Sequence, residues 1–427
     1  MTFDRRLSAA QAATHAVIDL DALAGNAIAL RRLLPKGAGL MAVVKANAYG
    51  HGLVPAARAF LAAGASWLGV ARIEEGLALR DAGITAPILV LGPPNPLLAE
   101  AAARSGLSLA VGSVDGLRRL VEQLPPDLPS QLPVHLKVDT GMHRFGVQPD
   151  DAAKALRSIV SDAYVRKYVQ LEGIFTHFAT ADEPGSNFAE VQAERFSATL
   201  RQLAEADLLP DNVYVHMANS AGSLRGLVDP GISGAHVLAR AGIALYGLEP
   251  SPAMPLPEGC RPALRLYSRV AHELAVPAGE GISYGLTYRP ERNIRCVVLP
   301  AGYGDGVSRL LSNQGWALID GRRCPIRGRV CMDQLVVETG EGGSVTPSSG
   351  TLATLIGDGS DEAMTAGNVA RLCGTINYEV VTAISARVPR VYLRDGRPVA
   401  VADLLGTVED DGPAPSSPLF QTVGRGG

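Results

Sequence analysis

Eight short apolar runs, separated by amphipathic segments, lie between about residue 40 and residue 250 of this sequence. The runs are GLMAVVK, WLGVA, PILVLG, LSLAVG, PVHLKVD, LEGIFTHFA, VYVHMA and HVLARAG. Helix-like stretches such as FAEVQAERFSATLRQLAEA lie between them. Continuous apolar strands that alternate with helices indicate a parallel sheet covered on both faces. Eight such units predict an α/β fold with a (β/α)8 barrel of the TIM type. A doubly wound open sheet is the alternative that strand counting alone leaves open.

After residue 265 the alternation of apolar runs and helix-like stretches ends. Strand-like segments such as LYSRVAHELAV, RCVVLPAGY and SARVPRVYL follow one another, separated by Gly, Pro and charged turns. We therefore predict a barrel domain over residues 15–255 and a mostly β C-terminal domain over residues 265–400. The Pro-rich segment EPSPAMPLPEGCRP separates them. Residues 404–427 have little to pack, and we expect them to be a disordered tail.

Charge and cysteine content limit the class of partner. The net charge of −3 gives no attraction to nucleic acid or to an anionic membrane, so neither is expected as a partner. The five cysteines are scattered without a C-x-x-C pair, which predicts neither a disulfide framework nor a metal site. The N-terminal segment lacks the apolar core of a secretory signal, and no stretch is long enough to span a bilayer. A cytoplasmic location is the expectation.

Polar residues follow the ends of several predicted strands, which is where the active site of such a barrel lies. They are Lys45, Asn47, Tyr49 and His51 after the first strand, Lys137, Asp139 and Arg144 at the fifth, His177 at the sixth, Asn219 and Ser220 after the seventh, and Arg240 in the eighth. Each alone has an ordinary structural explanation, such as an amine that reaches solvent or an asparagine that caps a helix. Their shared position at the strand ends favours one common site.

The residue types suggest the chemistry of that site. A desolvated lysine at a strand end can act as a nucleophile and form a Schiff base with an aldehyde, either of a substrate or of pyridoxal phosphate. Ser220 and the stretch from Gly242 fall after strands seven and eight, where such barrels commonly bind phosphate. Neither G-x-x-x-x-G-K-[ST] nor G-x-G-x-x-G is present, so nucleotide binding loses support.

Eight motifs occur in a specific order: AVVKANAYGHG, HLKVDTGMHRFG, FTHFATADE, HMANSAGS, RAGIALYG, ISYGLTY, GRVCMDQ and INYEV. Together they resemble the signatures of bacterial alanine racemase, a pyridoxal phosphate enzyme, over roughly residues 15–395. The resemblance implies a barrel plus a β domain, with HAVIDL near the N-terminus in the second domain, so residues 1–20 are expected to join it. It also implies interconversion of L-alanine and D-alanine by two bases on a pyridoxal phosphate aldimine. The enzyme would be a homodimer with shared active sites that supplies D-alanine for peptidoglycan.

The resemblance further implies a role for each matching residue. Lys45 looks like the Schiff-base lysine and the base on one face of the substrate, and Tyr284 of the other subunit looks like the base on the opposite face. The implied substrate-binding residues are Arg144, Met332 and Asp333. The implied cofactor-binding residues are Lys45, Tyr49, His177, Asn219, Ser220, Arg240, Gly242, Ile243 and Tyr378, with Arg240 beside the pyridine nitrogen. Lys137 matches a lysine that is often carbamylated, and His143 receives no role.

Several other functions are compatible with parts of this pattern. A free tyrosine has a pKa of about 10, so Tyr284 needs nearby positive charge, which an Arg240–His177–Tyr284 chain would supply. A serine or broad-specificity racemase stays open, because selectivity depends on pocket shape. A decarboxylase of the same architecture would be expected to carry an acid in place of Arg240. A non-catalytic pyridoxal phosphate carrier would have no need of Tyr284 and Met332.

Overall fold

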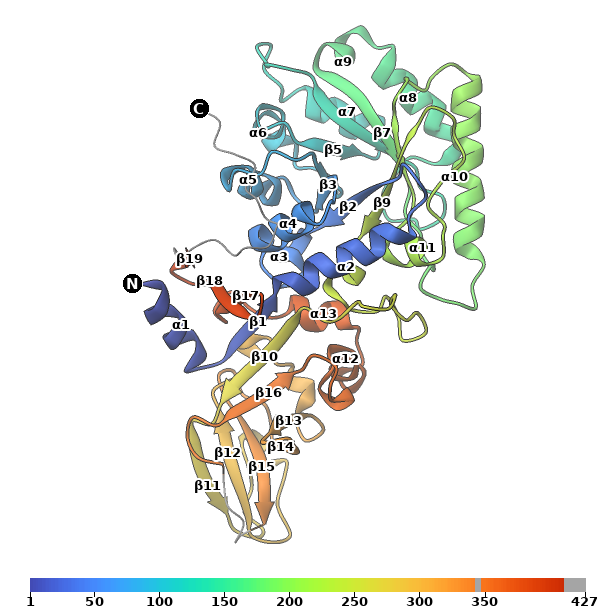
Figure 1. Cartoon of the computed structure of the whole chain (residues 1–427). Helices are drawn as coiled ribbons and strands as arrows, with labels where there is room; N and C mark the ends of the chain where they lie inside the picture. Colours follow the sequence, from blue (N-terminus) through green and yellow to red (C-terminus); the bar gives the residue numbers. More distant parts are fainter. Residues whose placement is uncertain (342–346, 411–427) are drawn as a thin grey trace.

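The computed structural model describes residues 1–341 and 347–410. Two bodies are visible in Figure 1: a barrel ringed by helices, and a long, mostly antiparallel sheet. Residues 411–427 of the predicted tail lie outside the described residues. No helix in the described ranges is both long enough and apolar enough to cross a membrane.

The barrel is closed by eight parallel strands, and each of the eight apolar runs forms one of them. This confirms the (β/α)8 prediction and excludes the open sheet. The strands are β2 (Gly39–Val43), β3 (Trp67–Val70), β4 (Ile88–Val90), β5 (Ser108–Val111), β6 (Leu132–Lys137), β7 (Val169–Phe175), β8 (Tyr214–His216) and β9 (His236–Ala241). Every residue of β3, β4 and β5 is buried, as expected for strands covered on both faces.

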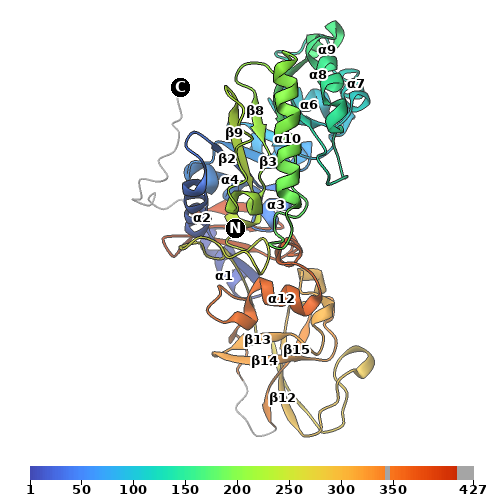
Figure 2. The same cartoon turned by 90° about the vertical axis from the view of Figure 1, so that its right-hand side faces the viewer.

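Helices form the outer layer of the barrel, and the longest of them, α10, runs along its outside in Figure 2. Side-chain caps fix several helix starts: Asp19 accepts from the Ala22 N–H, Ser113 from that of Gly116, and Asp162 from that of Tyr164. The helices are α2 (Leu20–Leu33), α4 (Leu53–Ala62), α5 (Ile73–Asp81), α6 (Ala99–Arg104), α7 (Val114–Val121), α8 (Ala152–Val160), α9 (Ala163–Tyr168), α10 (Phe188–Glu205) and α11 (Ser220–Leu224). The short element α3 (Lys45–Tyr49) follows β2 and has left-handed backbone angles inside it.

The second sheet contains eleven strands in the order β11-β12-β15-β14-β13-β16-β10-β1-β17-β18-β19. Its N-terminal member β1 (His15–Asp19) lies antiparallel to β10 and parallel to β17, so the start of the chain is part of the second sheet, as expected. The others are β10 (Leu264–Arg269), β11 (His272–Val276), β12 (Ile294–Leu299), β13 (Trp316–Ile319), β14 (Arg322–Arg327), β15 (Leu335–Glu341), β16 (Leu352–Ile356), β17 (Arg390–Arg394), β18 (Arg397–Asp403) and β19 (Gly406–Glu409).

The helices α1 (Phe3–Gln11), α12 (Ala366–Cys373) and α13 (Asn377–Thr382) accompany this sheet. Within the segment expected to be a disordered tail, residues 406–409 form β19 and pair with β18. Ordered structure therefore extends past residue 404, because β18 offers a free edge to which this segment can bond.

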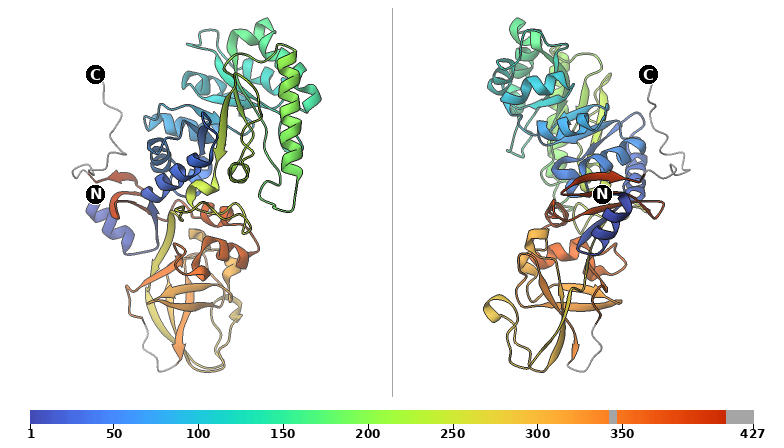
Figure 3. Two further views of the ribbon diagram at one scale, coloured as in Figure 1. Left: turned by 45° about the vertical axis from the view of Figure 1, so that its right-hand side comes forward. Right: turned by 90° about the vertical axis from the view of Figure 1, so that its left-hand side faces the viewer.

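The two bodies meet beside the first strand of the barrel, and Figure 3 shows the sheet on one side of that junction in both views. The backbone of Gly50 abuts that of Val381 in α13, where an added Cβ would lie 2.1 Å from the Val381 oxygen. The buried Arg390 of β17 donates to the Gly50 carbonyl over 3.1 Å. The segment after Lys45 is therefore held against the β domain, and α13 is brought to the rim of the barrel.

Candidate active site

A cavity of about 500 Å³ opens at the C-terminal ends of the barrel strands. The predicted residues that line it are Lys45, Tyr49, Lys137, Arg144, His177, Asn219, Ser220, Arg240, Gly242, Ile243 and Tyr378. They come from the ends of five strands, β2, β6, β7, β8 and β9, and from α13, so the expected convergence is observed. A second cavity of about 530 Å³ lies in the β domain beneath α12, and its largely apolar lining contains neither lysine nor histidine.

Lys45 stands at the start of an unusual turn. The four residues that follow it, Ala46, Asn47, Ala48 and Tyr49, all have φ between 51° and 54°. A left-handed conformation costs roughly 1–2 kcal/mol per non-glycine residue, so the surroundings must impose it. The Glu75 carboxylate accepts the Ala46 N–H over 2.7 Å, and the Asn47 side chain accepts the Leu53 N–H over 2.8 Å. The turn places Lys45 and Tyr49 on the same cavity.

The charges around Lys45 favour its neutral amine. Burial lowers the pKa of Lys45, the positive charges of Arg144 and Arg240 lower it further, and Glu75 opposes them. A lysine with a lowered pKa is a better nucleophile near neutral pH than one in water.

One end of the cavity is built from hydroxyls and backbone amides. The Ser220 hydroxyl oxygen lies 2.8 Å from the Gly242 nitrogen and accepts its N–H. A Cβ on Gly242 would stand 2.5 Å from the Tyr49 oxygen, so only glycine allows this approach. Burial raises the pKa of both Tyr49 and Tyr378, which keeps the two phenols neutral. This end suits a phosphate, which neutral donors and backbone N–H groups bind well.

Asn219 lines the same end but also has a structural task. Its side chain accepts the Gly222 N–H over 2.8 Å and caps α11. The capping explanation is therefore correct for its oxygen, and its position beside Ser220 is compatible with a further contact to a ligand.

Arg240 is almost completely buried, and its terminal nitrogens donate to five acceptors. Nη1 donates to Nδ1 of His216 over 2.7 Å and to the His216 carbonyl, and Nη2 donates to Nδ1 of His177 over 3.1 Å and to the Thr176 and Met217 carbonyls. Burial lowers the pKa of Arg240, but this set of acceptors holds the guanidinium as a cation. No acceptor for the Nε–H is found among the described residues, and Arg240 lines the cavity.

His177 lines the cavity beside Arg240. Burial and then the charge of Arg240 lower its pKa well below the usual value, so the ring is neutral. Because arginine only donates, Nδ1 of His177 accepts and its proton lies on Nε2. Arg240 and His177 are therefore hydrogen-bonded, and the chain from them to Tyr284 stays a prediction.

Lys137 is buried on the same rim and donates to the Phe145 carbonyl over 3.0 Å. Burial lowers its pKa to about 8, and the charges of Arg240 and Arg144 act in the same direction. Its Nζ lies 5.6 Å from the centre of the Phe175 ring. Burial and the nearby positive charges of two arginines both favour the neutral form of this amine.

Tyr284, Met332 and Asp333 do not line this cavity. They belong to the β domain, where the side chains of Tyr284 and Met332 are 74% and 52% exposed. Tyr284 follows Ser283, which has φ 61° and whose hydroxyl donates to the Arg329 carbonyl. The turn thus directs the phenol outward, away from the core of its own domain.

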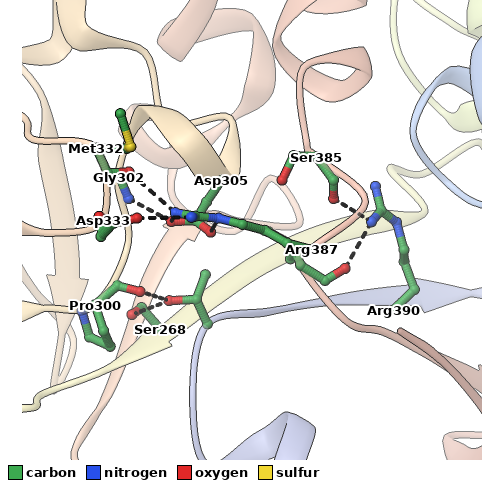
Figure 4. A network of polar contacts seen from close by, with 11 residues as sticks. Ser268, Pro300, Gly302, Asp305, Met332, Asp333, Ser385, Arg387 and Arg390 are labelled. Atoms are coloured by element: carbon green, nitrogen blue, oxygen red, sulfur yellow. Dashed lines mark hydrogen bonds and ion pairs between the residues drawn. The ribbon is translucent and has the colours of Figure 1, made fainter. Parts of the chain in front are cut away.

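Arg387 holds the segment that carries Met332 and Asp333, as Figure 4 shows. Its Nε lies 2.7 Å from Oδ1 of Asp305, its Nη1 lies 2.8 Å from Oδ1 of Asp333, and its Nη2 donates to the Met332 carbonyl over 3.3 Å. The Gly304 N–H donates to the same carbonyl over 2.9 Å. The exposed turn is therefore fixed in shape.

Sequence reasoning missed Glu75, Arg387 and the row of side chains behind Arg240. The row consists of His216, His135 and Glu172, all inside the barrel. The sequence did offer one indication of His135. It is two residues from Lys137 on the same strand, so the two side chains share a face.

The comparisons with known proteins agree with this geometry. Residues 18–250 match the family model "Alanine racemase, N-terminal domain", and residues 263–392 match "Alanine racemase, C-terminal domain". The chain is 45% identical over 380 residues to alanine racemase from Symbiobacterium thermophilum, which covers 89% of this chain and 97% of that protein. The crystal structure of alanine racemase from Bacillus anthracis with bound L-Ala-P has a TM-score of 0.82 and 38% identity, covering 92% of this chain and 98% of that one. Histidine racemase from Leuconostoc mesenteroides is also similar, with a TM-score of 0.77, 28% identity and 89% and 98% coverage.

Proposed function

Because this chain belongs to the alanine racemase family, a family of isomerases, we propose that it interconverts L-alanine and D-alanine with pyridoxal phosphate as its cofactor. One observation carries the proposal: Lys45, Arg240 and the hydroxyl-lined end around Ser220 all line one cavity. A lysine, a ring-nitrogen partner and a phosphate cradle are the three attachment points that such a cofactor requires.

The residues present fit the cofactor well. Lys45 would hold its aldehyde carbon, and Tyr49, Ser220, Gly242, Ile243 and Tyr378 would surround its phosphate. Arg240 would donate to the ring nitrogen, with His177 and Asn219 beside the ring. When bound, pyridoxal phosphate supplies an electron sink for the negative charge left at the α-carbon after proton removal.

Arg240 determines how strong that sink is. A guanidinium that stays protonated offers a hydrogen bond to the ring nitrogen but gives it no proton. With the cofactor bound, Arg240 would therefore keep the ring a weaker electron sink than an acidic partner would. The same observation argues against the decarboxylase alternative, for which an acidic residue is expected at this place.

Racemisation needs a proton removed from one face of the α-carbon and returned from the other. Lys45 is the proposed base on one face, since its lowered pKa makes the amine able to accept a proton. The proposed base on the opposite face is Tyr284 of a second copy of the chain. Its exposure supports this assignment. The hydrogen bond from Arg240 to His177 also supports it, because the positive charge of Arg240 would lower the pKa of a phenol nearby.

We therefore propose a head-to-tail homodimer in which each β domain completes the cavity of the other subunit. Support comes from the exposed apolar side chains that share the β domain with Tyr284, namely Leu286, Tyr303, Leu310 and Met332. Exposed apolar surface of this kind marks an interaction site. In the dimer, the fixed turn at Met332 and Asp333 would meet the substrate carboxylate together with Arg144.

Lys137 is proposed to carry a carbamate. The neutral amine reacts with carbon dioxide, and its pKa of about 8 makes that form available near neutral pH. The modification would turn a third cation on this rim into an anion able to orient Arg144 by charge-assisted hydrogen bonds. A crystal structure with a bare amine at Lys137 would reject this proposal.

The decisive experiment is the conversion of L-alanine by the purified chain loaded with pyridoxal phosphate. D-alanine is measured by chiral chromatography, with Lys45→Ala as the control. We expect D-alanine from the wild type and none from the variant. Serine, lysine, arginine and histidine are tested in parallel, and faster racemisation of any of them than of alanine would overturn the substrate assignment.

The cellular role is a separate proposal. We propose that the D-alanine supplies peptidoglycan synthesis in the cytoplasm. The gene should then restore growth of a bacterial strain that lacks alanine racemase and depends on added D-alanine.

A further inference from the structure

We propose that Glu172, His135 and His216 form a row of hydrogen bonds through the barrel, in which each donor and each acceptor is fixed. This row orients Arg240 in the site. Glu172 and His135 would thus be positioning residues of the racemase, although neither lines the cavity. The inference rests on the proposed function of Arg240.

The row is continuous and deeply placed. Nδ1 of His216 lies 2.7 Å from Nη1 of Arg240, and its Nε2 lies 2.8 Å from Nδ1 of His135. Nε2 of His135 lies 3.1 Å from Oε2 of Glu172, which also accepts the Ser108 hydroxyl. Both imidazoles are completely buried, and the Glu172 side chain is a quarter exposed.

Only one arrangement of protons fits these contacts. The guanidinium of Arg240 can only donate, so Nδ1 of His216 accepts and the proton of that ring lies on Nε2. That N–H points at Nδ1 of His135, which must therefore accept and carry its own proton on Nε2. The second N–H points at the carboxylate of Glu172. A second proton on either ring would place two N–H groups against each other.

The row also supplies the counter-charge of Arg240. Among the described residues, no aspartate or glutamate forms an ion pair with Arg240, although the guanidinium is almost fully buried. Glu172 is the acidic group that reaches it through hydrogen bonds, two rings away. Burial alone would raise the pKa of Glu172, but the hydrogen bond from His135 holds it below its ordinary value, so the far end of the row stays anionic. Hydrogen bonds that all point the same way between opposite charges strengthen one another.

Simple packing does not account for this row. The interior of such barrels is usually filled by layers of branched apolar side chains. Elsewhere in this barrel, neighbouring strands supply such a cluster, formed by Met41, Trp67, Leu89 and Leu238. Buried polar groups that end in two charges are costly unless every member is paired. Here the row ends at the one arginine that both lines the cavity and is buried, which points to control of Arg240.

The consequence concerns the orientation of the guanidinium. Nη1 is fixed by His216 and Nη2 by His177 and two carbonyls, so the orientation of the guanidinium beside the cavity is set by these partners. If Glu172 is lost, the proton of His135 is free to move to Nδ1, which reverses the donor of His216. An N–H of His216 would then oppose Arg240 and turn it from its place.

The first test reads the protons directly. Holoenzyme labelled with ¹⁵N in the histidine rings is examined by NMR near neutral pH, with His135→Gln and His216→Gln used for assignment. We expect both rings to carry a proton on Nε2 and a bare Nδ1. A proton on Nδ1 of either ring in the wild type overturns the proposal. This reading needs no activity, so it holds even if the wild type makes no D-alanine, a result that would overturn only the proposed function.

The second test compares two changes at Glu172. Glu172→Leu removes both acceptor and charge, and we expect a mixture of His216 tautomers and a kcat lower by about 10-fold, as for loss of one charged hydrogen bond, with alanine KM changed by less than about 2-fold. Glu172→Gln keeps an acceptor and should fall between this variant and the wild type.

Glu190→Leu serves as the matched control, because Glu190 is a half-exposed carboxylate on α10 that bonds Arg225 and does not touch the row. It should leave the ring signals and kcat unchanged. A folded Glu172→Leu enzyme with wild-type tautomers and wild-type kcat overturns the proposal. If Glu172→Leu does not fold, the wild-type tautomers and the partial effect of Glu172→Gln decide it.

Discussion

The carboxylate of Glu75 lies 2.7 Å from the backbone nitrogen of Ala46, the residue directly after Lys45. Its other oxygen accepts the N–H groups of Ala71, over 2.7 Å, and Arg72, over 3.2 Å. One side chain therefore joins the end of β2 to the loop after β3. Since the turn after Lys45 is left-handed over four residues, this carboxylate stabilises a conformation that the sequence alone would not adopt.

Glu75→Ala is expected to loosen that turn. Loss of a charged acceptor for three backbone N–H groups should lower the free energy of unfolding by roughly 2 kcal/mol or more. The looser turn should also weaken cofactor binding, because Lys45 and Tyr49 would no longer be held together. Urea unfolding and a pyridoxal phosphate titration followed by absorbance measure the two effects.

The neighbouring Glu74 provides the control for this prediction. It is exposed and lies in the same first turn of α5, so Glu74→Ala keeps the helix charge comparable. Equal behaviour of the two variants would show that Glu75 acts only through the charge of the helix end.

Gly242→Ala is expected to damage the phosphate end of the cavity. The added methyl group would stand 2.5 Å from the Tyr49 oxygen, so the phenol must move. Overpacking of this kind costs roughly 1–3 kcal/mol, which corresponds to about 5-fold to about 150-fold in cofactor affinity. Equilibrium dialysis of pyridoxal phosphate measures it.

Gly25→Ala is the matched glycine control. Gly25 lies exposed in α2, and a Cβ there meets nothing within 4 Å. The substitution should raise stability by roughly 0.5–1 kcal/mol and leave cofactor affinity unchanged.

Arg240→Glu tests whether the guanidinium suppresses side reactions. A carboxylic acid can share a proton with the ring nitrogen, which would make the cofactor a stronger sink and lengthen the life of the negative charge at the α-carbon. We expect slower racemisation and more transamination, measured as pyruvate released from alanine. An unchanged ratio of pyruvate to D-alanine would contradict this account.

Arg387→Ala should act on substrate binding more than on the cofactor. The change releases Asp333 and the Met332 carbonyl from Asp305, and the turn that they form loses its fixed shape. KM for alanine is expected to rise by about 5-fold or more, with a smaller change in kcat, as for lost binding shared by the ground and transition states. Arg371→Ala, which removes a side chain bonded to Asn368 on α12, should change neither constant.

The barrel could be predicted from the sequence because buried parallel strands appear as continuous apolar runs. All eight runs became strands, and most of their residues are buried between the helices and the barrel interior. The partners of β1 could not be found in the same way. They lie more than 240 residues away along the chain, and only the resemblance placed HAVIDL in the second sheet. Periodicity reports which face is buried, not which strand covers it.

The site shows the same division. Strand-end position was enough to gather Lys45, Lys137 and Arg240, because every parallel strand delivers its C-terminal end to one rim. Glu75 could not be predicted from the sequence, because its partners are backbone amides, which every residue type except proline carries. His135 and His216 were not predicted as residues that support the site, because a histidine in an apolar strand is usually an ordinary buried residue. Their contact joins two strands that are not neighbours in the barrel, and the strand order has to be known to see it.

His51, in the same motif as Lys45, should make the fold sensitive to acid. It is completely buried, and its Nδ1 bonds the Ala48 and Tyr49 carbonyls while Nε2 has no acceptor or donor among the described residues. Burial lowers its pKa to about 4, the two carbonyls oppose this shift, and the charge of Arg390 adds to it. The folded state thus keeps His51 neutral while the unfolded chain binds a proton below about pH 6.5.

The unfolded state therefore holds more protons between about pH 6.5 and pH 4, so stability falls as the pH falls through this window. Between pH 6.5 and pH 5 the loss from His51 should be about 2 kcal/mol. His51→Asn, which keeps a donor for the carbonyls, should be less stable at pH 7 but lose correspondingly less on acidification. Urea unfolding of both proteins at pH 6.5 and at pH 5 measures this difference in stability. His272→Asn, at an exposed position on β11, should retain the full acid sensitivity of the wild type, and an identical slope in His51→Asn would show that other buried groups cause it.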